Sequence, residues 1–174
     1  SLTTLLKFIE KKKPDYIIFA NEGTSNVNLR KDIYPEYKNR SPIDEGLRTQ
    51  IKECFELLIK MKIPVLSKEG YEADDIIGTF ARMADEDDMY DATIVSSDKD
   101  LLQLISHDVN VKLLKQKDYI LMDEQVFFDT YGHAVVPLQG GLAIRDINAD
   151  EAQTEGYFSP AKHDGGGYVI QSSY

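Results

Sequence analysis

Short apolar runs alternate with amphipathic helical stripes up to residue 105, and this alternation limits the possible fold more than any other feature. Continuous apolar runs are typical of strands buried on both faces; they occur at residues 15–20, 63–66 and 91–97. Apolar residues at helical spacing occur between them, at 2–11, 43–62 and 72–84. Such alternation predicts an α/β fold with a mainly parallel central sheet and helices on both faces.

The pattern changes after residue 105. A short helix at "DLLQLI" (100–105) precedes two strands that we expect to pair, at 110–115 and 119–122, and a helix at 123–132 that ends at Gly132. Beyond residue 133 glycines are frequent and periodicity is weak. We therefore predict a domain over 1–132 and a loosely structured tail over 133–174, with one strand at "GYVIQSSY" (167–174).

Composition excludes several classes of protein. The chain has one cysteine, three scattered histidines and no apolar run near membrane-spanning length, which argues against a disulfide framework, a cysteine-based zinc site and a membrane partner. A cytoplasmic location is the default expectation. The net charge of -10 disfavours nucleic acid on average. Charge is segregated, however: residues 30–40 carry a net +2, whereas residues 85–91 carry five acids.

Two acidic clusters occur at the ends of otherwise apolar segments. Glu72, Asp74 and Asp75 open a helix, and Asp98 and Asp100 follow a strand. One interpretation is helix capping, because acids satisfy the free N–H groups of a first turn and complement the helix dipole. The other is a metal site, because ligands bind at the carboxyl ends of parallel strands and all-oxygen ligands suit Mg²⁺ or Mn²⁺. On that interpretation the carboxyl groups of Glu72, Asp75 and Asp98 should lie within about 8 Å of one another.

Three segments resemble a known family. They are "YPEYKNRSPIDEGLRTQI" (34–51), "GYEADDIIGTFA" (70–81) and "SSDKDLLQLI" (96–105). Their order and spacing are similar to those of the 5′-nuclease domain of bacterial DNA polymerase I, in the flap-endonuclease, PIN-like superfamily. The resemblance covers roughly residues 2–132. It implies a three-layer PIN-like fold and a structure-specific 5′ nuclease that acts on DNA with a 5′ flap or 5′ end, in replication or repair.

The resemblance also implies roles for individual residues. Up to two Mg²⁺ or Mn²⁺ ions would be held by five carboxylates: Glu72, Asp74, Asp75, Asp98 and Asp100. Lys38 and Arg40 would act at the scissile phosphate, and the DNA-binding set would be Arg30, Tyr37, Lys38 and Arg40. Of the further family acids, one would be substituted by Glu22 in a loop of different length, Asp150 aligns with another, and Asp146 lies one residue from the matching position. A polymerase domain is the implied partner within a parent protein.

The family's first strand, which ends in Ile-Asp-Gly, has no counterpart ahead of residue 15. A position left open in a sheet exposes unpaired backbone groups and invites another strand. We predict that "GYVIQSSY" takes this position beside residues 16–20 or 93–96, with Gln171 where the family has a metal-binding Asp. The alternative is a flexible tail, with the sheet left short or completed by another chain.

Two rival functions stay open. A toprim-like phosphotransfer domain would use Glu22 with Asp98 and Asp100, but it leaves "EADD" (72–75) without a role. A catalytically impaired remnant of the nuclease fold would bind nucleic acid without cutting it.

Overall fold

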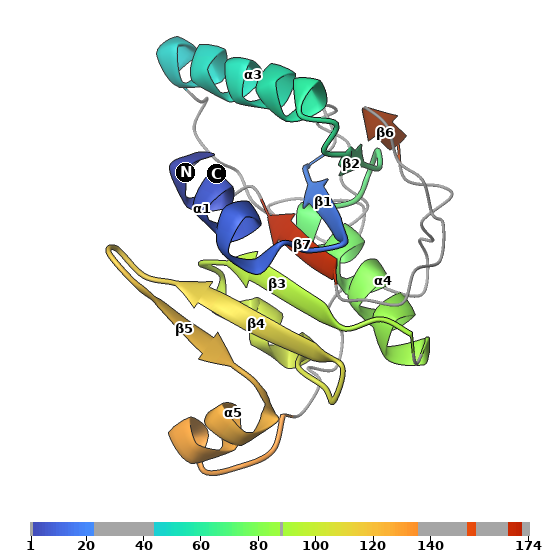
Figure 1. The fold of residues 1–174 in the computed structure, drawn as a ribbon, viewed down its shortest axis with the longest axis vertical. Coiled ribbons are helices and arrows are strands. Elements are labelled where there is room, and N and C mark those ends of the chain that lie inside the picture. Colours follow the sequence, from blue (N-terminus) through green and yellow to red (C-terminus); the bar gives the residue numbers. More distant parts are fainter. Residues whose placement is uncertain (1, 23–43, 88, 136–152, 156–166, 172–174) are drawn as a thin grey trace.

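A seven-stranded sheet forms the centre of the computed structural model, which describes residues 2–22, 44–87, 89–135, 153–155 and 167–171 (Figure 1). The last two ranges are described by their backbone alone. The strands are β1 (Tyr16–Ala20), β2 (Val65–Ser67), β3 (Ala92–Ser96), β4 (Val109–Leu114), β5 (Tyr119–Met122), β6 (Gln153–Glu155) and β7 (Gly167–Gln171). Their order across the sheet is β5-β4-β3-β7-β1-β2-β6. Only the pairs β4–β5 and β2–β6 are antiparallel, so the predicted mainly parallel sheet is confirmed.

The described helices follow the predicted segments closely. They are α1 (Leu2–Lys12), α3 (Glu45–Lys60), α4 (Ala73–Glu86), the 3₁₀ helix η1 (Lys99–Leu104) and α5 (Glu124–Tyr131). Local side chains explain several of the ends. Asp123 Oδ1 accepts a hydrogen bond from the Val126 amide at 2.8 Å and so caps the start of α5. Gly132 ends the same helix in the left-handed region, at φ 77°, which glycine adopts without a steric penalty.

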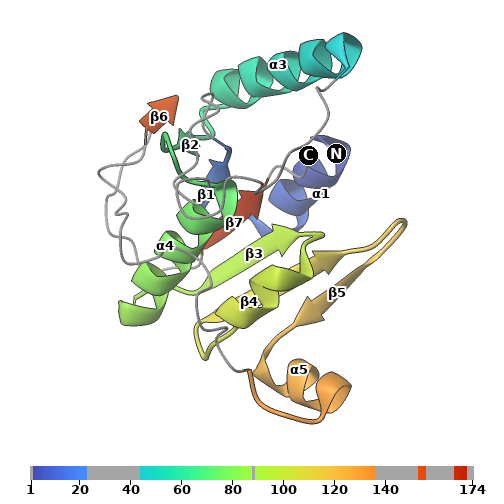
Figure 2. The ribbon, with the colours of Figure 1, turned by 180° about the vertical axis from the view of Figure 1, so that it is seen from behind.

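Helices cover both faces of the sheet, as Figures 1 and 2 show from opposite sides. On one face, Leu5 and Phe8 of α1 and Leu58 of α3 pack in a buried cluster with Phe19 of β1 and Val95 of β3. On the other face, α4 and η1 lie against the sheet. Their buried cluster joins residues of α4, η1 and five strands, among them Ile76, Ile77, Leu101, Ile18, Leu66, Ile94 and Val111. The three-layer α/β arrangement predicted from the sequence is therefore confirmed.

Strand β7 lies in the middle of the sheet although it comes last along the chain. It runs parallel to both neighbours, from Tyr16↔Gly167 to Ala20↔Gln171 on one side and from Ala92↔Gly167 to Val95↔Ile170 on the other. The prediction that this segment pairs beside residues 16–20 or 93–96 is confirmed, on both sides at once. The proposed boundary between a domain and a tail at residue 132 stays a prediction, and β6 and β7 show that residues beyond it add strands to the same sheet.

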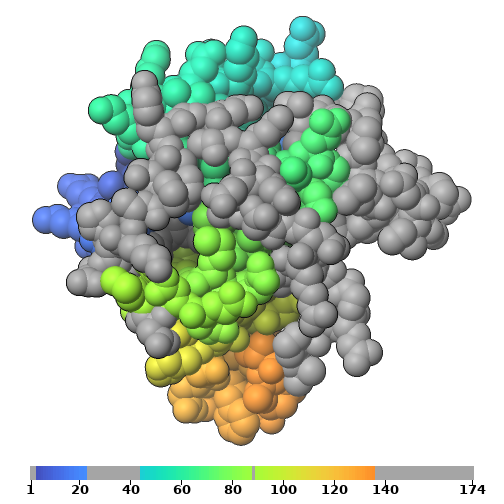
Figure 3. Space-filling view, turned by 90° about the vertical axis from the view of Figure 1, so that its right-hand side faces the viewer, coloured from blue at the N-terminus to red at the C-terminus, as the bar shows by residue number. Residues whose placement is uncertain are grey.

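Helix α4 bridges the sheet behind β7. It contacts β1, β2, β3, β4 and β7. In the space-filling view its surface lies between that of α3 and that of α5 (Figure 3). Every third or fourth residue of α4 is apolar and buried, so burial of this stripe favours the helix and holds the two sides of the sheet together.

Lys112 of β4 is buried, which is unusual for a charged side chain. Its Nζ lies 3.8 Å from the ring centroid of Phe8 in α1 and 3.7 Å from that of Tyr119 in β5. Cation–π contacts of this kind contribute about 0.5–2 kcal/mol. Burial nevertheless lowers the pKa of the Lys112 ammonium, and the neighbouring Tyr119 opposes this shift.

Lys112→Met should change how stability depends on pH. Because the pKa of Lys112 is lowered on folding, the unfolded chain binds more protons between that lowered value and the ordinary 10.5, so stability should rise with pH in this window. The variant should lose this part of the rise. Urea unfolding of both proteins between pH 7 and 10 measures it, with the exposed Lys7→Met as the control. An identical pH dependence in Lys112→Met and the parent would contradict the assignment.

Candidate functional site

The carboxyl ends of the parallel strands define one edge of the sheet. β1, β2, β3 and β7 run the same way and end at Ala20, Ser67, Ser96 and Gln171. The acidic residues come directly after these ends: Glu22 follows β1, Glu72 opens α4 after β2, and Asp98 follows β3. The fold thus brings both acidic clusters to the edge at which parallel sheets bind ligands.

Glu72 and Asp75 form the buried part of this edge. Asp75 is fully buried and Glu72 is 5% exposed, at the N-terminus of α4. Asp75 Oδ2 accepts a hydrogen bond from the Glu72 amide at 3.0 Å, and the Asp75 carbonyl accepts one from Thr79 Oγ1 at 2.8 Å. A buried carboxylate is costly unless hydrogen bonds or charges compensate it, and the first turn of α4 supplies N–H groups and the positive end of the helix dipole.

Asp98 is fixed by a turn of its own. Its Oδ1 accepts a hydrogen bond from the Asp100 amide at 2.8 Å and so begins η1. Its own amide donates to Oγ of the buried Ser96 at 3.0 Å. Our sequence analysis did not single out Ser96, although the spacing "SSD" (96–98), with a hydroxyl two residues before the acid, is the signal for such a turn. Asp74 is half-buried and Asp100 is exposed.

The capping interpretation is therefore confirmed for Asp75 and Asp98. It does not compete with ligand binding, because an ionised carboxylate has about four acceptor sites. Among the residues that the structure describes, no three His, Cys, Asp or Glu side chains are grouped closely enough to hold a metal ion. A shared ion between Glu72, Asp75 and Asp98 stays a prediction.

Several predicted site residues fall outside the described part of the chain. They are the basic and aromatic set Arg30, Tyr37, Lys38 and Arg40, and the acids Asp146 and Asp150. Their predicted roles are unaffected by the geometry above. No described helix has the length and apolar character that crossing a membrane requires.

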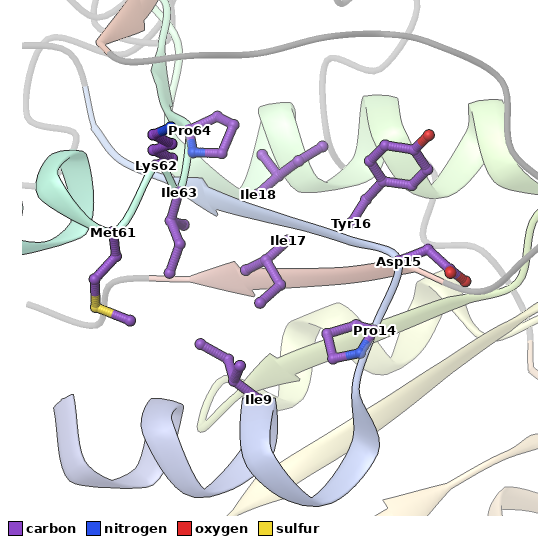
Figure 4. Close-up of a pocket in the computed structure, with 10 residues that line it drawn as sticks. All are labelled: Ile9, Pro14, Asp15, Tyr16, Ile17, Ile18, Met61, Lys62, Ile63 and Pro64. Carbon is purple, nitrogen blue, oxygen red and sulfur yellow. The ribbon is translucent and has the colours of Figure 1, made fainter.

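A pocket lies at the opposite, amino edge of the sheet, below the start of β1 (Figure 4). Its volume is about 380 Å³. Its walls are mostly apolar and come from the ends of α1 and α3 and the starts of β1 and β2, including Ile9, Ile17, Met61 and Ile63. Asp15 and Lys62 are the charged residues among those that line it. The acidic clusters and this pocket are therefore separate features at two edges of one sheet.

Comparison with protein families gives a match over most of the chain. The family described as the 5′-3′ exonuclease, N-terminal resolvase-like domain matches residues 1–132. The chain belongs to this family.

Among its relatives, DNA polymerase I of Caldicellulosiruptor bescii is 38% identical over 117 residues, which are 67% of this chain and 14% of that protein. DNA polymerase I of Borreliella burgdorferi is 35% identical over 148 residues, or 84% of this chain and 16% of that protein. The chain thus spans a small part of these relatives.

Solved structures support the fold. A structure of the T5 5′-exonuclease with bound divalent metal ions (zinc) matches with a TM-score of 0.53 and 16% identity, covering 75% of this chain and 51% of that one. A crystal structure of the T5 D15 protein, co-crystallised with metal ions, matches with the same TM-score and 15% identity, covering the same shares of the two chains. At these identities the likeness shows the fold alone, and it confirms the PIN-like fold that the resemblance implied.

Asp75→Ala and Asp75→Asn should show how much the Asp75 side chain contributes to folding. Asp75→Ala removes the acceptor of the buried Glu72 amide and should lower the free energy of unfolding by about 1–3 kcal/mol. Asp75→Asn keeps a carbonyl oxygen at this position and should lower it less. Urea unfolding measures both, with Asp100→Ala as an exposed control. Equal stability of Asp75→Ala and the parent would show that the hydrogen bond contributes nothing to folding.

Proposed function

We propose that this chain is the metal-dependent nuclease part of a structure-specific 5′ nuclease, which hydrolyses phosphodiesters at DNA 5′ flaps or 5′ ends. The observation that carries the proposal is the buried pair Glu72 and Asp75 at the carboxyl edge of the sheet, beside the strand that leads into Asp98. The two buried acids cost folding free energy that apolar side chains of similar volume would not cost. Their presence at the binding edge of the sheet therefore supports a role in ligand binding.

The donor set suits a hard divalent cation. All five proposed ligands, Glu72, Asp74, Asp75, Asp98 and Asp100, offer carboxylate oxygens, which Mg²⁺ and Mn²⁺ prefer over nitrogen and sulfur ligands. When bound, such ions stabilise the attacking and leaving oxygens of a phosphodiester. The protein's part is to hold the acids in place. The hydrogen bonds that fix Asp75 and Asp98 do this from the helix side.

The substrate would be held by the basic segment. We assign DNA binding to Arg30, Tyr37, Lys38 and Arg40, with Lys38 and Arg40 placed against the scissile phosphate. Lysine and arginine neutralise phosphate, and tyrosine can stack on an unpaired base. Replication or repair, a polymerase domain in the parent protein and a cytoplasmic location belong to the same proposal.

A second candidate is a nucleic-acid-binding remnant of the fold that does not cut. The observation in its favour is that Asp75 and Asp98 already have capping roles, so they would be kept for folding alone. On this account the protein binds flap DNA through its basic segment and has no use for Mg²⁺ or Mn²⁺.

A flap-cleavage assay with and without Mn²⁺ distinguishes the two candidates. The parent protein should release the 5′ flap only with Mn²⁺, and the double variant Asp75→Asn plus Asp98→Asn should lose activity on the order of 100-fold or more, because several kcal/mol of charge stabilisation are removed. Calorimetry should show Mn²⁺ binding that this variant lacks. Asp91→Asn is the matched control, since Asp91 is exposed at the other end of β3.

A second experiment measures the affinity for flap DNA of the double variant Lys38→Ala plus Arg40→Ala. Each lost phosphate contact should reduce the slope of log affinity against log salt by about 0.9. Lys11→Ala plus Lys12→Ala, at the exposed end of α1, removes the same charge elsewhere and should change the slope less. Flap DNA bound without any Mn²⁺-dependent cleavage would favour the remnant.

A further inference from the structure

The described strands form two halves of the sheet on either side of β7. On one side lie β5, β4 and β3, and on the other lie β1, β2 and β6. Among the described strands, none of one half pairs with a strand of the other, so β7 provides the strand pairing that links them. We call the position between β1 and β3 the strand slot.

Side chains outside β7 also join the two walls of the strand slot. On the α4 face, one buried cluster contains Ile18 of β1 and Ile94 of β3 together with Ile77 of α4. On the α1 face, a second buried cluster contains Phe19 of β1 and Val95 of β3 together with Phe8 of α1. Each helix layer thus packs on both halves at once. The described buried residues of these two clusters lie between residues 5 and 122, so they precede β7 in the chain.

The slot pairs with the backbone of β7 on both sides. It pairs five residues of β7 with β1 and four with β3. Addition of an extended segment to a sheet draws its affinity from main-chain hydrogen bonds, which a separate segment of the same sequence makes equally well. Nothing in this mode of binding requires that the strand belong to the same chain.

We propose that the strand slot is a strand-acceptor site, and that β7 of a second copy of this chain can occupy it in place of the chain's own β7. The covalent connection determines whether the slot binds its own β7 or the β7 of a second copy. A strand in the same chain has a much higher effective concentration at the slot than a strand of a second copy, so the chain's own β7 is bound at ordinary protein concentrations. Exchange with a second copy becomes dominant when the connection is too short to close.

The length of the connection allows a direct design. β6 ends at Glu155, level with Val65 and Phe19, and β7 begins at Gly167, level with Tyr16. Three strand spacings and an offset of three residues separate these points by roughly 17 Å. Residues 156–166 can extend to about 40 Å, whereas two residues reach only about 11 Å. Deletion of residues 157–165 should therefore prevent β7 from entering its own slot while leaving β7 itself complete.

The experiment measures the mass of the otherwise full chain by light scattering during gel filtration. The deletion of residues 157–165 should give a dimer, and replacement of the same nine residues by glycine and serine should give a monomer. Val169→Pro in the deletion chain should abolish the dimer, because proline cannot donate to a central ladder. A deletion chain that is monomeric, or whose dimer survives Val169→Pro, overturns the proposal.

A second measurement uses the 174-residue Val169→Pro chain without the deletion, and a synthetic peptide of residues 165–174. Peptide at about 100 times its Kd should raise the Tm by roughly 5–10 °C, and the same peptide with proline at position 169 should leave it unchanged. No shift with the first peptide, or equal shifts with both, overturns the proposal. Neither readout involves DNA cleavage, so failure here is independent of the nuclease proposal.

Discussion

Backbone pairing at the centre of the sheet is the constraint on which the rest of the structure depends. A buried N–H or C=O group without a partner costs about as much as a lost hydrogen bond, so β1 and β3 each need a parallel neighbour on their inner sides. β7 supplies both neighbours at once. The two buried clusters, the position of α4 behind the sheet and the alignment of the strand ends all follow from a sheet that is continuous across this point.

The same continuity places the candidate site. Because β1, β7 and β3 are adjacent and parallel, the residues after them share one edge, and α4 begins at that edge with Glu72 and Asp75. The hydrogen bonds that cap α4 and η1 hold Asp75 and Asp98 in fixed positions. Asp75 and Asp98 can therefore cap the helices and take part in the proposed metal binding at the same time. Family membership adds the expectation of nuclease chemistry, and the buried acids supply its local support.

Much of the fold could be predicted because local signals agree with burial. Apolar runs indicated β1, β2 and β3, and Gly132 indicated the end of α5. The place of β7 followed from a resemblance that left one strand unmatched. β6 was not predicted, since three residues, "QTE", carry no period. Nor was the burial of Lys112, because Phe8, one of the two rings against its Nζ, belongs to a segment far from it in sequence. Whether the acids converge depends on side-chain positions that spacing does not fix.

Hydrogen exchange of the 174-residue chain, followed by mass spectrometry, tests the central position of β7 most directly. Amides in the middle of a sheet exchange through the larger opening reactions of a protein, whereas those of weakly packed segments exchange through local ones. Residues 167–171 should therefore exchange as slowly as residues 16–20 and 92–96, and more slowly than α5, which has no buried residue. Rapid exchange of residues 167–171 beside slow exchange of β1 and β3 would contradict the account.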